Sequence, residues 1–189
     1  HQTFLEFIKS TKEFLVICID DHGGREIAKL AKELRLNLIT YGESEIAQMS
    51  ISHISTSALG SFFRVTWQGV VLGEVALNIP GKHNVLNATA ALAAGMSLGL
   101  NPSQLILGLS KFQGVRRRFE LKGSVKNIRV FDDYAHHPTE VSATIATARD
   151  VVEKGKIIVI FQPHRYSRTL AFSQGFAESL SAADQVILL

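Results

Sequence analysis

The chain has 189 residues, 46% of them hydrophobic and 20% charged, with a formal net charge of +3. This composition is typical of a globular chain with a real core, and its Lys and Arg residues form no run of five or more, so we expect no nucleic-acid partner. The one cysteine, Cys18, excludes a disulfide framework and favours a reducing cytoplasm, and no apolar stretch reaches the ~18 residues that would predict a membrane span.

The N-terminal part of the chain is predicted to form parallel α/β structure. Residues 4–8 have the pattern of a helix end, and residues 14–19 and 38–41 are apolar enough for strands. An amphipathic helix at residues 25–36 is expected between these strands. The turn at residues 20–24 contains two aspartates and two glycines but lacks the spacing of a dinucleotide or P-loop fingerprint. We therefore interpret it as an ordinary turn.

The middle of the chain changes to short strands and then to helices. Between residues 46 and 79, glycines interrupt segments in which apolar and polar residues alternate, which predicts an antiparallel meander at the edge of the same domain. A long alanine-rich helix is expected from Pro80 to about Leu98, and a short helix follows at residues 103–109.

Three polar side chains near the start of the long helix are candidates for a nucleotide site. His83 and Asn87 are four residues apart, and Asn84 and Asn87 are three apart, so all of them share one helix face. An amide offers both a donor and an acceptor, which match the N6 and N7 edge of adenine. Asparagine is also a common helix cap, and the residues alone leave both interpretations open.

Residues 116–118 are consecutive arginines between Gly114 and a new strand. They form either a solvated basic turn or a grip on an anion at a domain junction, because the planar guanidinium suits phosphate. We expect the domain boundary near Gln113, where the alanine-rich helix and its short successor end and new α/β structure begins.

The stretch at residues 128–141 holds the strongest candidates for chemistry. Residues 128–131 predict a buried strand, which ends in Asp-Asp-Tyr-Ala-His-His before Pro138 opens a helix. That helix is predicted to have an apolar face made of Val141, Ile145, Ala148 and Val152. Ligands of open α/β sheets bind at the carboxyl ends of strands, and this turn occupies such an end.

A second strand is expected at residues 156–161, and its continuously apolar sequence favours burial on both faces. We expect it to lie parallel to strand 128–131 in one right-handed βαβ unit, so that both strands end at one rim of the sheet. That rim would carry side chains able to bind anions or transfer protons, namely Asp132, Asp133, His136, His137, His164, Arg165 and Arg168. For any one of them alone, a solvated turn residue or helix cap is the alternative.

Four motifs resemble, in this order, the Mur ligases of peptidoglycan synthesis, and most closely the members that add L-alanine. They are Gly-Lys-His-Asn-Val-Leu-Asn-Ala (81–88), Phe-Gln-Gly-Val-Arg-Arg-Arg-Phe-Glu (112–120), Asp-Asp-Tyr-Ala-His-His-Pro-Thr-Glu-Val (132–141) and Phe-Gln-Pro-His-Arg-Tyr-Ser-Arg-Thr (161–169). The resemblance implies an α/β fold in two parts. Residues 1–113 would be the end of a central ATP-binding domain with its meander, and residues 114–189 the first half of a Rossmann-like, amino-acid-binding C-terminal domain.

The resemblance also implies an activity. Mur ligases of this kind are ATP-dependent enzymes of the cytoplasm that phosphorylate the carboxylate of UDP-N-acetylmuramate to an acyl phosphate, which the amino group of L-alanine then attacks. The implied partners are therefore the small molecules UDP-N-acetylmuramate, L-alanine and ATP, with Mg²⁺, and neither a nucleic acid nor a membrane. The protein contributes mainly positioning and charge neutralisation to such chemistry.

Carried over by motif, the resemblance assigns roles to individual residues. His83, Asn84 and Asn87 would contact the adenine, Asp133 the ribose, and Arg118 the γ-phosphate as a catalytic residue. His136 and His137 would be catalytic, and Tyr134, His164, Arg165 and Arg168 would bind L-alanine.

Two departures from the family pattern carry further expectations. No Gly-x-x-x-x-Gly-Lys-Ser/Thr occurs, so the P-loop, the metal ligands and the UDP-sugar domain are expected before His1, and the fragment alone is expected to be inactive. A start at His1 and a buried strand predicted at residues 185–189 fit an internal fragment. Ala135 stands where the family has glycine, so this turn is either ordinary or strained.

The rival hypothesis is a non-catalytic nucleotide-binding module or regulatory paralogue of the same fold. An intact P-loop upstream would favour the enzyme, and a broken one would favour the module.

Overall fold

The computed structural model describes residues 2–152 and 154–189, which divide into two compact units. The first unit runs to Ser55 and includes Ser61–Leu77 and His83–Phe112. The second unit consists of Thr56–Gly60, Asn78–Lys82 and Gln113–Leu189. His1, on which part of the fragment expectation rests, lies outside the described residues.

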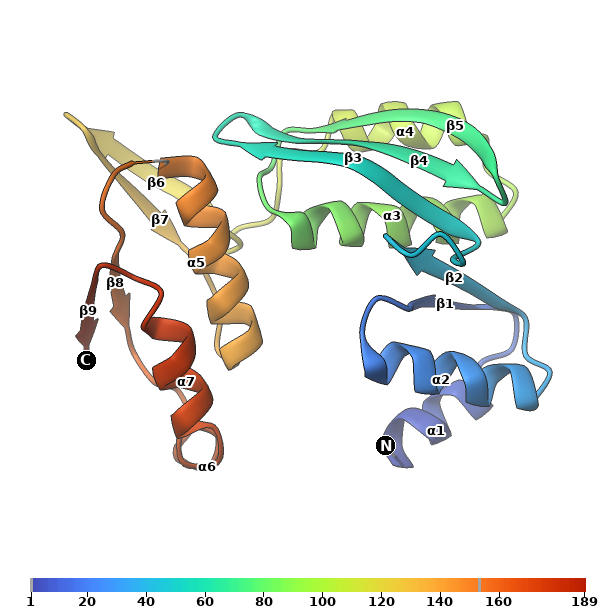
Figure 1. Ribbon diagram of the computed structural model, residues 1–189, viewed down its shortest axis with the longest axis horizontal. Coiled ribbons are helices and arrows are strands. Elements are labelled where there is room, and N and C mark those ends of the chain that lie inside the picture. Colours follow the sequence, from blue (N-terminus) through green and yellow to red (C-terminus); the bar gives the residue numbers. More distant parts are fainter. Residues whose placement is uncertain (1, 153) are drawn as a thin grey trace. The chain divides into compact units, whose positions relative to one another are not determined.

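The first unit begins with the predicted parallel strand–helix–strand segment. Its elements are α1 (Gln2–Ser10), β1 (Leu15–Cys18), α2 (His22–Glu33) and β2 (Leu38–Gly42). The two strands pair in parallel, with Leu15 opposite Leu38. Both helices lie on the same side of the strands (Figure 1), and Ile8, Leu15 and Ala31 are buried between the two layers.

Helix α2 begins three residues earlier than the apolar periodicity predicts, at His22 instead of Arg25. The reason is local, because Asp21 is its N-cap and its carboxylate accepts a hydrogen bond from the Gly24 N–H at 2.8 Å. Gly23 and Gly24 therefore belong to the helix. The turn after β1 is correspondingly shorter than expected.

The predicted meander continues the same sheet. It consists of β3 (Met49–Ser57), β4 (Gly60–Trp67) and β5 (Val70–Leu77), and the sheet order is β1-β2-β3-β4-β5. β3 pairs with β2 in parallel, whereas β4 and β5 are antiparallel. Gly73 interrupts no strand, because it lies at a register shift inside β5 with a φ of 152°. The first unit thus has one mixed five-stranded sheet.

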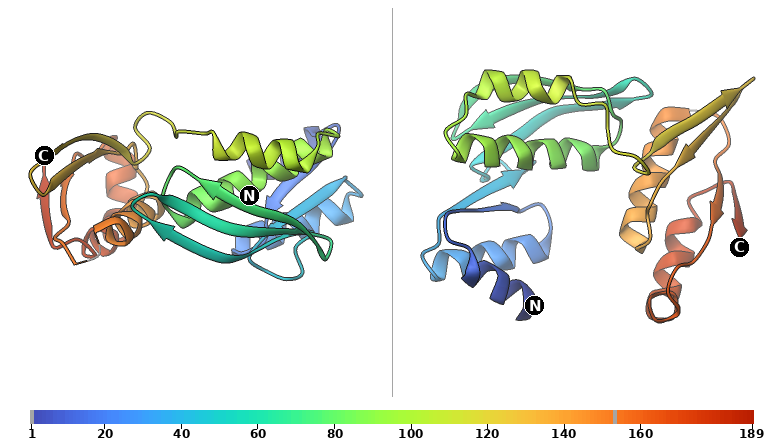
Figure 2. Two further views of the ribbon diagram at one scale, coloured as in Figure 1. Left: turned by 90° about the horizontal axis from the view of Figure 1, so that it is seen from above. Right: turned by 180° about the vertical axis from the view of Figure 1, so that it is seen from behind.

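Two helices complete the first unit. They are α3 (Lys82–Ser97), which is rich in alanine as predicted, and α4 (Pro102–Ser110). α4 lies along β5 in all three views (Figure 1, Figure 2), with Ile106 against Gly73. The absence of a side chain at Gly95 lets α3 approach α4 closely, since a Cβ there would lie 2.7 Å from Leu105.

The second unit is built from two small sheets and three helices. A hairpin of β6 (Glu120–Val125) and β7 (Ile128–Asp132) comes first, followed by α5 (Pro138–Val152). The chain then forms β8 (Ile158–Phe161), α6 (Tyr166–Ala171), α7 (Ser173–Leu180) and β9 (Gln185–Leu188). β8 and β9 pair in parallel.

The prediction that strands 128–131 and 156–161 are parallel neighbours is wrong for the described residues. β7 pairs with β6 across a tight two-residue turn, and β8 pairs instead with β9. β7 pairs with β6, which is nearer in sequence than β8, because a hairpin needs only a short turn whereas a parallel pair needs a longer crossover connection. The parallel pair of the second unit is therefore β8 and β9, joined through α6 and α7.

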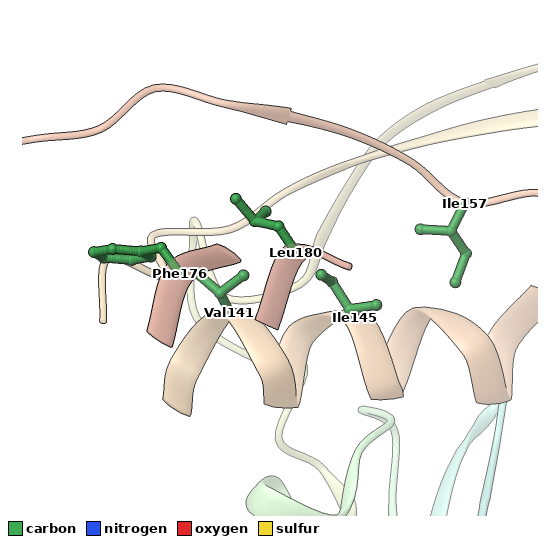
Figure 3. Packing of buried hydrophobic residues seen from close by; sticks show 5 residues of the cluster. All are labelled: Val141, Ile145, Ile157, Phe176 and Leu180. Carbon is green, nitrogen blue, oxygen red and sulfur yellow. The ribbon is translucent and has the colours of Figure 1, made fainter. Parts of the chain in front are cut away.

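The predicted burial of these strands is also wrong, and for β8 the reason is that helices cover only one of its faces. Ile128 of β7 is 68% exposed, Ile160 of β8 is 65% exposed, and all four residues of β9 are exposed. The covered face has the core shown in Figure 3, made of Val141, Ile145, Ile157, Phe176 and Leu180. The predicted apolar face of α5 is confirmed, with Ala148 and Val152 packed against this core.

Candidate functional site

The side chain of Asp133 joins the arginine-rich turn to the aspartate-rich turn. One carboxylate oxygen accepts a hydrogen bond from the Phe119 N–H at 2.7 Å, and the other accepts from the Ala135 N–H at 2.7 Å. Each oxygen keeps a second lone pair. The carboxylate that was predicted to hold a ribose is thus also the clamp that positions the two turns.

Arg117 makes the same connection through both its backbone and its side chain. Its carbonyl oxygen accepts a hydrogen bond from the Tyr134 N–H at 2.7 Å, and its guanidinium lies 4.9 Å from the centre of the Tyr134 ring. Its Nε is 3.6 Å from an Asp132 oxygen. The middle arginine of the triplet is therefore tied to the turn that follows β7, although its side chain is 60% exposed.

The junction holds two non-glycine residues in a left-handed conformation. Arg117 has a φ of 59° and Phe119 a φ of 48°. Such backbone costs on the order of 1 kcal/mol or more per residue and persists only where the surroundings fix it. Here the Asp133 clamp and the stacked rings of Phe119 and Phe131, whose centres are 4.4 Å apart, provide that constraint.

Glu140, in the first turn of α5, organises the histidine pair. One of its oxygens accepts hydrogen bonds from the backbone N–H groups of His136 at 2.9 Å and His137 at 3.2 Å. Its other oxygen lies 4.0 Å from the Arg118 guanidinium. Burial acts to raise the pKa of Glu140, but these N–H groups and the charges of His136 and Arg118 hold it below its usual value.

The sequence interpretation missed Glu140, although a signal was present. A Glu at the third helical position commonly reaches back to the N–H of the capping residue, and Glu140 occupies that position relative to His137. The helix start was predicted correctly at Pro138, so the capping pattern could have been found.

The two histidines differ in what their rings contact. Nδ1 of His136 lies 2.8 Å from the Tyr134 carbonyl oxygen, and the two rings meet edge to face. Nδ1 of His137 accepts a hydrogen bond from the Thr139 N–H at 3.3 Å, while its ring packs against Phe172. Both rings are therefore held by the chain around them.

The segment after β8 reaches this site through Arg168, which lies in α6. Its guanidinium donates to the His136 carbonyl oxygen at 3.5 Å, which keeps further N–H donors available. Arg165 is the residue before α6, has a φ of 76° and has an exposed side chain, as does His164. No side-chain hydrogen bond or ion pair joins either residue to the histidine pair within the described chain.

We call the assembled set the arginine–histidine site: Arg118, Asp133, Tyr134, His136, His137, Glu140 and Arg168. Of these residues, the sequence interpretation expected Asp133, His136, His137 and Arg168 to meet at a shared sheet rim. The structure gathers them through side-chain hydrogen bonds to backbone groups instead, because β7 and β8 belong to different sheets.

The predicted adenine residues lie in the first unit. His83, Asn84 and Asn87 all belong to α3, which begins at Lys82. Neither asparagine precedes the first helical residue, so neither is its N-cap. The amide of Asn87 lies one turn further along an exposed face, where a ligand can reach it.

Three further observations concern the described residues alone. Ala135 does not have a positive φ, so the alanine in this turn has an ordinary conformation. Within residues 2–152 and 154–189, no three His, Cys, Asp or Glu side chains form a group that could hold a metal ion. None of the helices found there combines the length and hydrophobicity that crossing a membrane demands.

Comparison with known proteins gives two family matches. The Mur ligase middle domain matches residues 1–95, and the domain described as "Mur ligase, glutamate ligase domain" matches residues 117–189. The first match alone covers half of the chain.

Named relatives agree with these matches. The chain is 44% identical to the UDP-N-acetylmuramate–L-alanine ligase of Acidothermus cellulolyticus, over 100% of this chain and 40% of that protein. It is 38% identical to the ligase of the same name from Thermobifida fusca, over 100% of this chain and 42% of that protein. The chain therefore spans about two fifths of the length of these relatives.

Solved structures show the same fold. The UDP-N-acetylmuramate-alanine ligase of Thermotoga maritima superposes with a TM-score of 0.73 at 30% identity, covering 96% of this chain and 46% of that one. A MurF ligase from the same organism, solved in complex with ADP, gives a TM-score of 0.77 at 20% identity, over 98% of this chain and 42% of that one. With both family domains matched in order, and with the α/β architecture shared, the chain belongs to the Mur ligase family.

Proposed function

We propose that the full-length protein is an ATP-dependent ligase that joins L-alanine to UDP-N-acetylmuramate through an acyl phosphate, in the cytoplasmic synthesis of peptidoglycan precursors. The relatives with this name, which match the whole chain, support the proposal. So does the arginine–histidine site, which combines two guanidinium groups with two imidazoles. That combination suits a reaction in which phosphate charge is neutralised while an amine loses a proton.

The domain assignment follows from the same proposal. Residues 1–113 would be the C-terminal part of the central, ATP-binding domain, and residues 114–189 the N-terminal part of the amino-acid-binding domain. Two observations support this division, since the family matches end at residue 95 and begin again at residue 117, and the second compact unit takes up the chain from Gln113.

For the nucleotide, we assign adenine contacts to His83, Asn84 and Asn87, the ribose to Asp133, and the γ-phosphate to Arg118. Support for the first three comes from the shared helix face of α3. Asp133 keeps one lone pair on each oxygen for a hydroxyl group, and Arg118 is half exposed, with its guanidinium 4.0 Å from Glu140. ADP is bound by the Thermotoga maritima MurF ligase, which shares this fold.

For the amino acid, we assign binding to Tyr134, His164, Arg165 and Arg168. A guanidinium can hold a carboxylate with two parallel hydrogen bonds, which fixes both orientation and charge. Arg168 is the best supported of the four, because it already contacts the backbone of His136. His136 and His137 are then the catalytic histidines next to the amino group.

Mg²⁺ belongs to the proposal, with ligands expected in a preceding part of the full-length protein. When bound, Mg²⁺ neutralises the charge of the transferred phosphoryl group. No group of three or more His, Cys, Asp or Glu side chains that could hold a metal ion is found among the described residues. The P-loop and the site for the UDP-sugar are likewise assigned to that preceding part.

The test is a steady-state assay of L-alanine-dependent phosphate release by the full-length protein. Arg168→Lys keeps the positive charge but loses the two parallel N–H donors of the guanidinium. We therefore expect a higher KM for L-alanine and an almost unchanged KM for ATP. Arg116→Lys, on an exposed arginine outside the site, is the matched control. Equal rises in both KM values would move this turn to the nucleotide, and a wild-type protein that binds ATP without ligating would favour the non-catalytic module. The 189-residue chain alone should release no phosphate.

A further inference from the structure

The contact of His136 fixes the position of its proton. A carbonyl oxygen can only accept a hydrogen bond, so the 2.8 Å contact with the Tyr134 carbonyl requires a proton on Nδ1 of His136. In the neutral ring, Nε2 then carries the free lone pair. Nε2 has no hydrogen-bond partner among the described residues, and the side chain is 31% exposed.

The contact of His137 fixes the opposite arrangement. A backbone N–H can only donate, so the 3.3 Å hydrogen bond from Thr139 requires a bare Nδ1 on His137. The proton of the neutral ring must then be on Nε2. The two rings therefore present opposite tautomers to their surroundings.

The groups around the two rings strengthen this difference. The Glu140 carboxylate lies 3.6 Å from Nδ1 of His136, where it supports the proton on that nitrogen and any positive charge that the ring gains. The other Glu140 oxygen faces Arg118, and Arg168 contacts the His136 backbone carbonyl. At His137 the ring instead meets the apolar Phe172.

We propose that these adjacent histidines have different tasks, fixed by opposite tautomers: Nε2 of His136 accepts a proton from the amino group of the incoming amino acid, and Nε2–H of His137 donates a hydrogen bond to an oxygen of the acyl phosphate. Glu140 is the positioning residue of the pair. The inference rests on the proposed function and deepens it, because that proposal leaves the two histidines equivalent.

The ammonium of the amino acid gives one proton to His136, and the resulting amine attacks the acyl carbonyl carbon. The new C–N bond forms, the bond from that carbon to the phosphate oxygen breaks, and inorganic phosphate leaves. The second amine proton leaves with phosphate, and the imidazolium of His136 returns its proton to water. The Glu140 carboxylate stabilises the imidazolium in the meantime.

The first test measures the tautomers directly and needs no ligase activity. The 189-residue chain, labelled with ¹⁵N in its histidines, is recorded by long-range proton–nitrogen NMR at alkaline pH, where neutral rings show their tautomer. His136→Gln and His137→Asn assign the two signals by their disappearance. We expect a proton on Nδ1 of His136 and on Nε2 of His137. The same tautomer in both rings, or the reverse pair, would overturn the inference.

The second test separates the roles by kinetics in the full-length protein. His136→Ala should lower kcat by about 100-fold or more, which is typical of a lost general base, and added imidazole should restore part of it. The KM for ATP should stay within about twofold. A merely structural histidine would not respond to imidazole, so the absence of rescue contradicts the base role.

His137→Asn provides the complementary variant, because asparagine is a good N-cap and preserves the start of α5. We expect roughly a tenfold loss of kcat, as for one hydrogen bond to a charged oxygen, and no rescue by imidazole. Unchanged kcat would reduce His137 to a helix cap. His22→Ala, at a side chain that is 80% exposed in the first unit, is the control for loss of an imidazole elsewhere.

The two failures are distinguishable. A wild-type full-length protein without L-alanine-dependent phosphate release refutes the proposed function, and with it the proton transfer, even if the tautomers are as expected. An active protein with the wrong tautomers, or with an insensitive His136, refutes only the division of tasks.

Discussion

Two turns in this chain have the same beginning, an apolar strand followed by a pair of aspartates, and the structure uses them in similar ways. After β1, the carboxylate of Asp20 accepts hydrogen bonds from the backbone N–H groups of Glu43 and Ser44, between 2.9 and 3.3 Å. After β7, the carboxylate of Asp133 accepts from Phe119 and Ala135. In both turns, one aspartate fastens a distant loop to the end of a strand.

The difference lies in what surrounds the clamps. The Asp20 turn is closed by its own chain, since Arg25 donates to the carbonyls of Ile19 and Asp20 and a glycine at position 42 lets the carboxylate approach. The Asp133 turn lies instead beside guanidinium and imidazole groups, those of Arg118, His136 and His137.

The comparison shows that an Asp-Asp pair at a strand end does not by itself indicate catalysis. Such an aspartate first accepts hydrogen bonds from backbone N–H groups that are buried or lie in a turn. Function is indicated instead by charged side chains that the aspartate holds in place through the backbone but does not itself bind. The predictions below separate the two turns by this criterion.

The largest effect is expected in the Asp20 turn, for Gly24→Ala. A Cβ at position 24 would lie 1.8 Å from the Cys18 carbonyl oxygen, which is backbone and cannot move aside. We expect a loss of more than about 3 kcal/mol in the free energy of unfolding of the first unit, measured by urea denaturation with Trp67 fluorescence.

Gly23→Ala is the matched control for this substitution. It lies in the same helical turn, and its Cβ would meet only the Asp21 side chain at 3.3 Å. We expect a change within about 0.5 kcal/mol. If both variants were equally destabilised, the close approach of position 24 to the Cys18 carbonyl could not be the cause, because only Gly24 makes it.

The second prediction compares the clamps themselves. Asp20→Ala and Asp133→Ala each leave at least two backbone N–H groups without a charged acceptor, so each should lower the free energy of unfolding by about 2–3 kcal/mol. In full-length kinetics the milder Asp20→Asn should leave the KM for ATP unchanged, whereas Asp133→Asn should raise it. A similar KM in both Asn variants would make Asp133 a clamp only.

The third prediction concerns Arg118, whose side chain is 51% exposed and is expected to contribute little to the stability of the fold. Arg118→Ala should cost less than about 1 kcal/mol of stability. In the full-length enzyme it should lower turnover about ten- to a hundredfold, equivalent to about 1.4–2.7 kcal/mol of barrier. Arg116→Ala should do neither, and equal kinetic effects of the two substitutions would reduce the triplet to a general basic patch.

Local pattern predicted the elements of this fold well, because helices and their apolar faces depend on near neighbours. The face of α5, with Val141 and Ile145 buried, follows from spacing alone. Strand partners and burial were predicted less well. Whether β7 pairs with β6 or β8, and whether Ile160 is covered, depends on segments far away in sequence.

The site shows the same limit. Its residue types could be predicted, since each motif contains them, but their arrangement could not. Arg118 and Glu140 lie 4.0 Å apart only because Asp133 fastens the arginine turn to the end of β7. That hydrogen bond spans fourteen residues and leaves no periodic trace in the sequence.

The smallest predicted effect is on the pH dependence of stability, which should have opposite signs in the two units. In the second unit, hydrogen bonds from backbone N–H groups lower the pKa of Glu120 and Asp184 from ordinary values of 4.5 and 3.8, and the pKa of Glu140 is lowered as well. A carboxyl whose folded pKa is depressed contributes stability above its unfolded pKa and loses it as pH falls through the folded pKa. The second unit should therefore weaken below about pH 4.5.

In the first unit, burial, followed by the nearby Cys18 and Asp20, raises the pKa of Tyr41 from 10.0 to about 12, and burial raises the pKa of Cys18 as well. The folded state then holds these protons longer than the unfolded state, so the first unit should lose stability between about pH 9 and pH 12. Because Tyr41 is partly exposed, screening should limit the loss to about 1 kcal/mol. Trp67 fluorescence reports the first unit and amide hydrogen exchange in α5 reports the second. Tyr41→Phe should reduce only the loss of stability at alkaline pH, and Glu140→Gln only the loss at acid pH. If a single variant changed both losses, the two units would unfold as one. Stability measurements could then not separate the two turns.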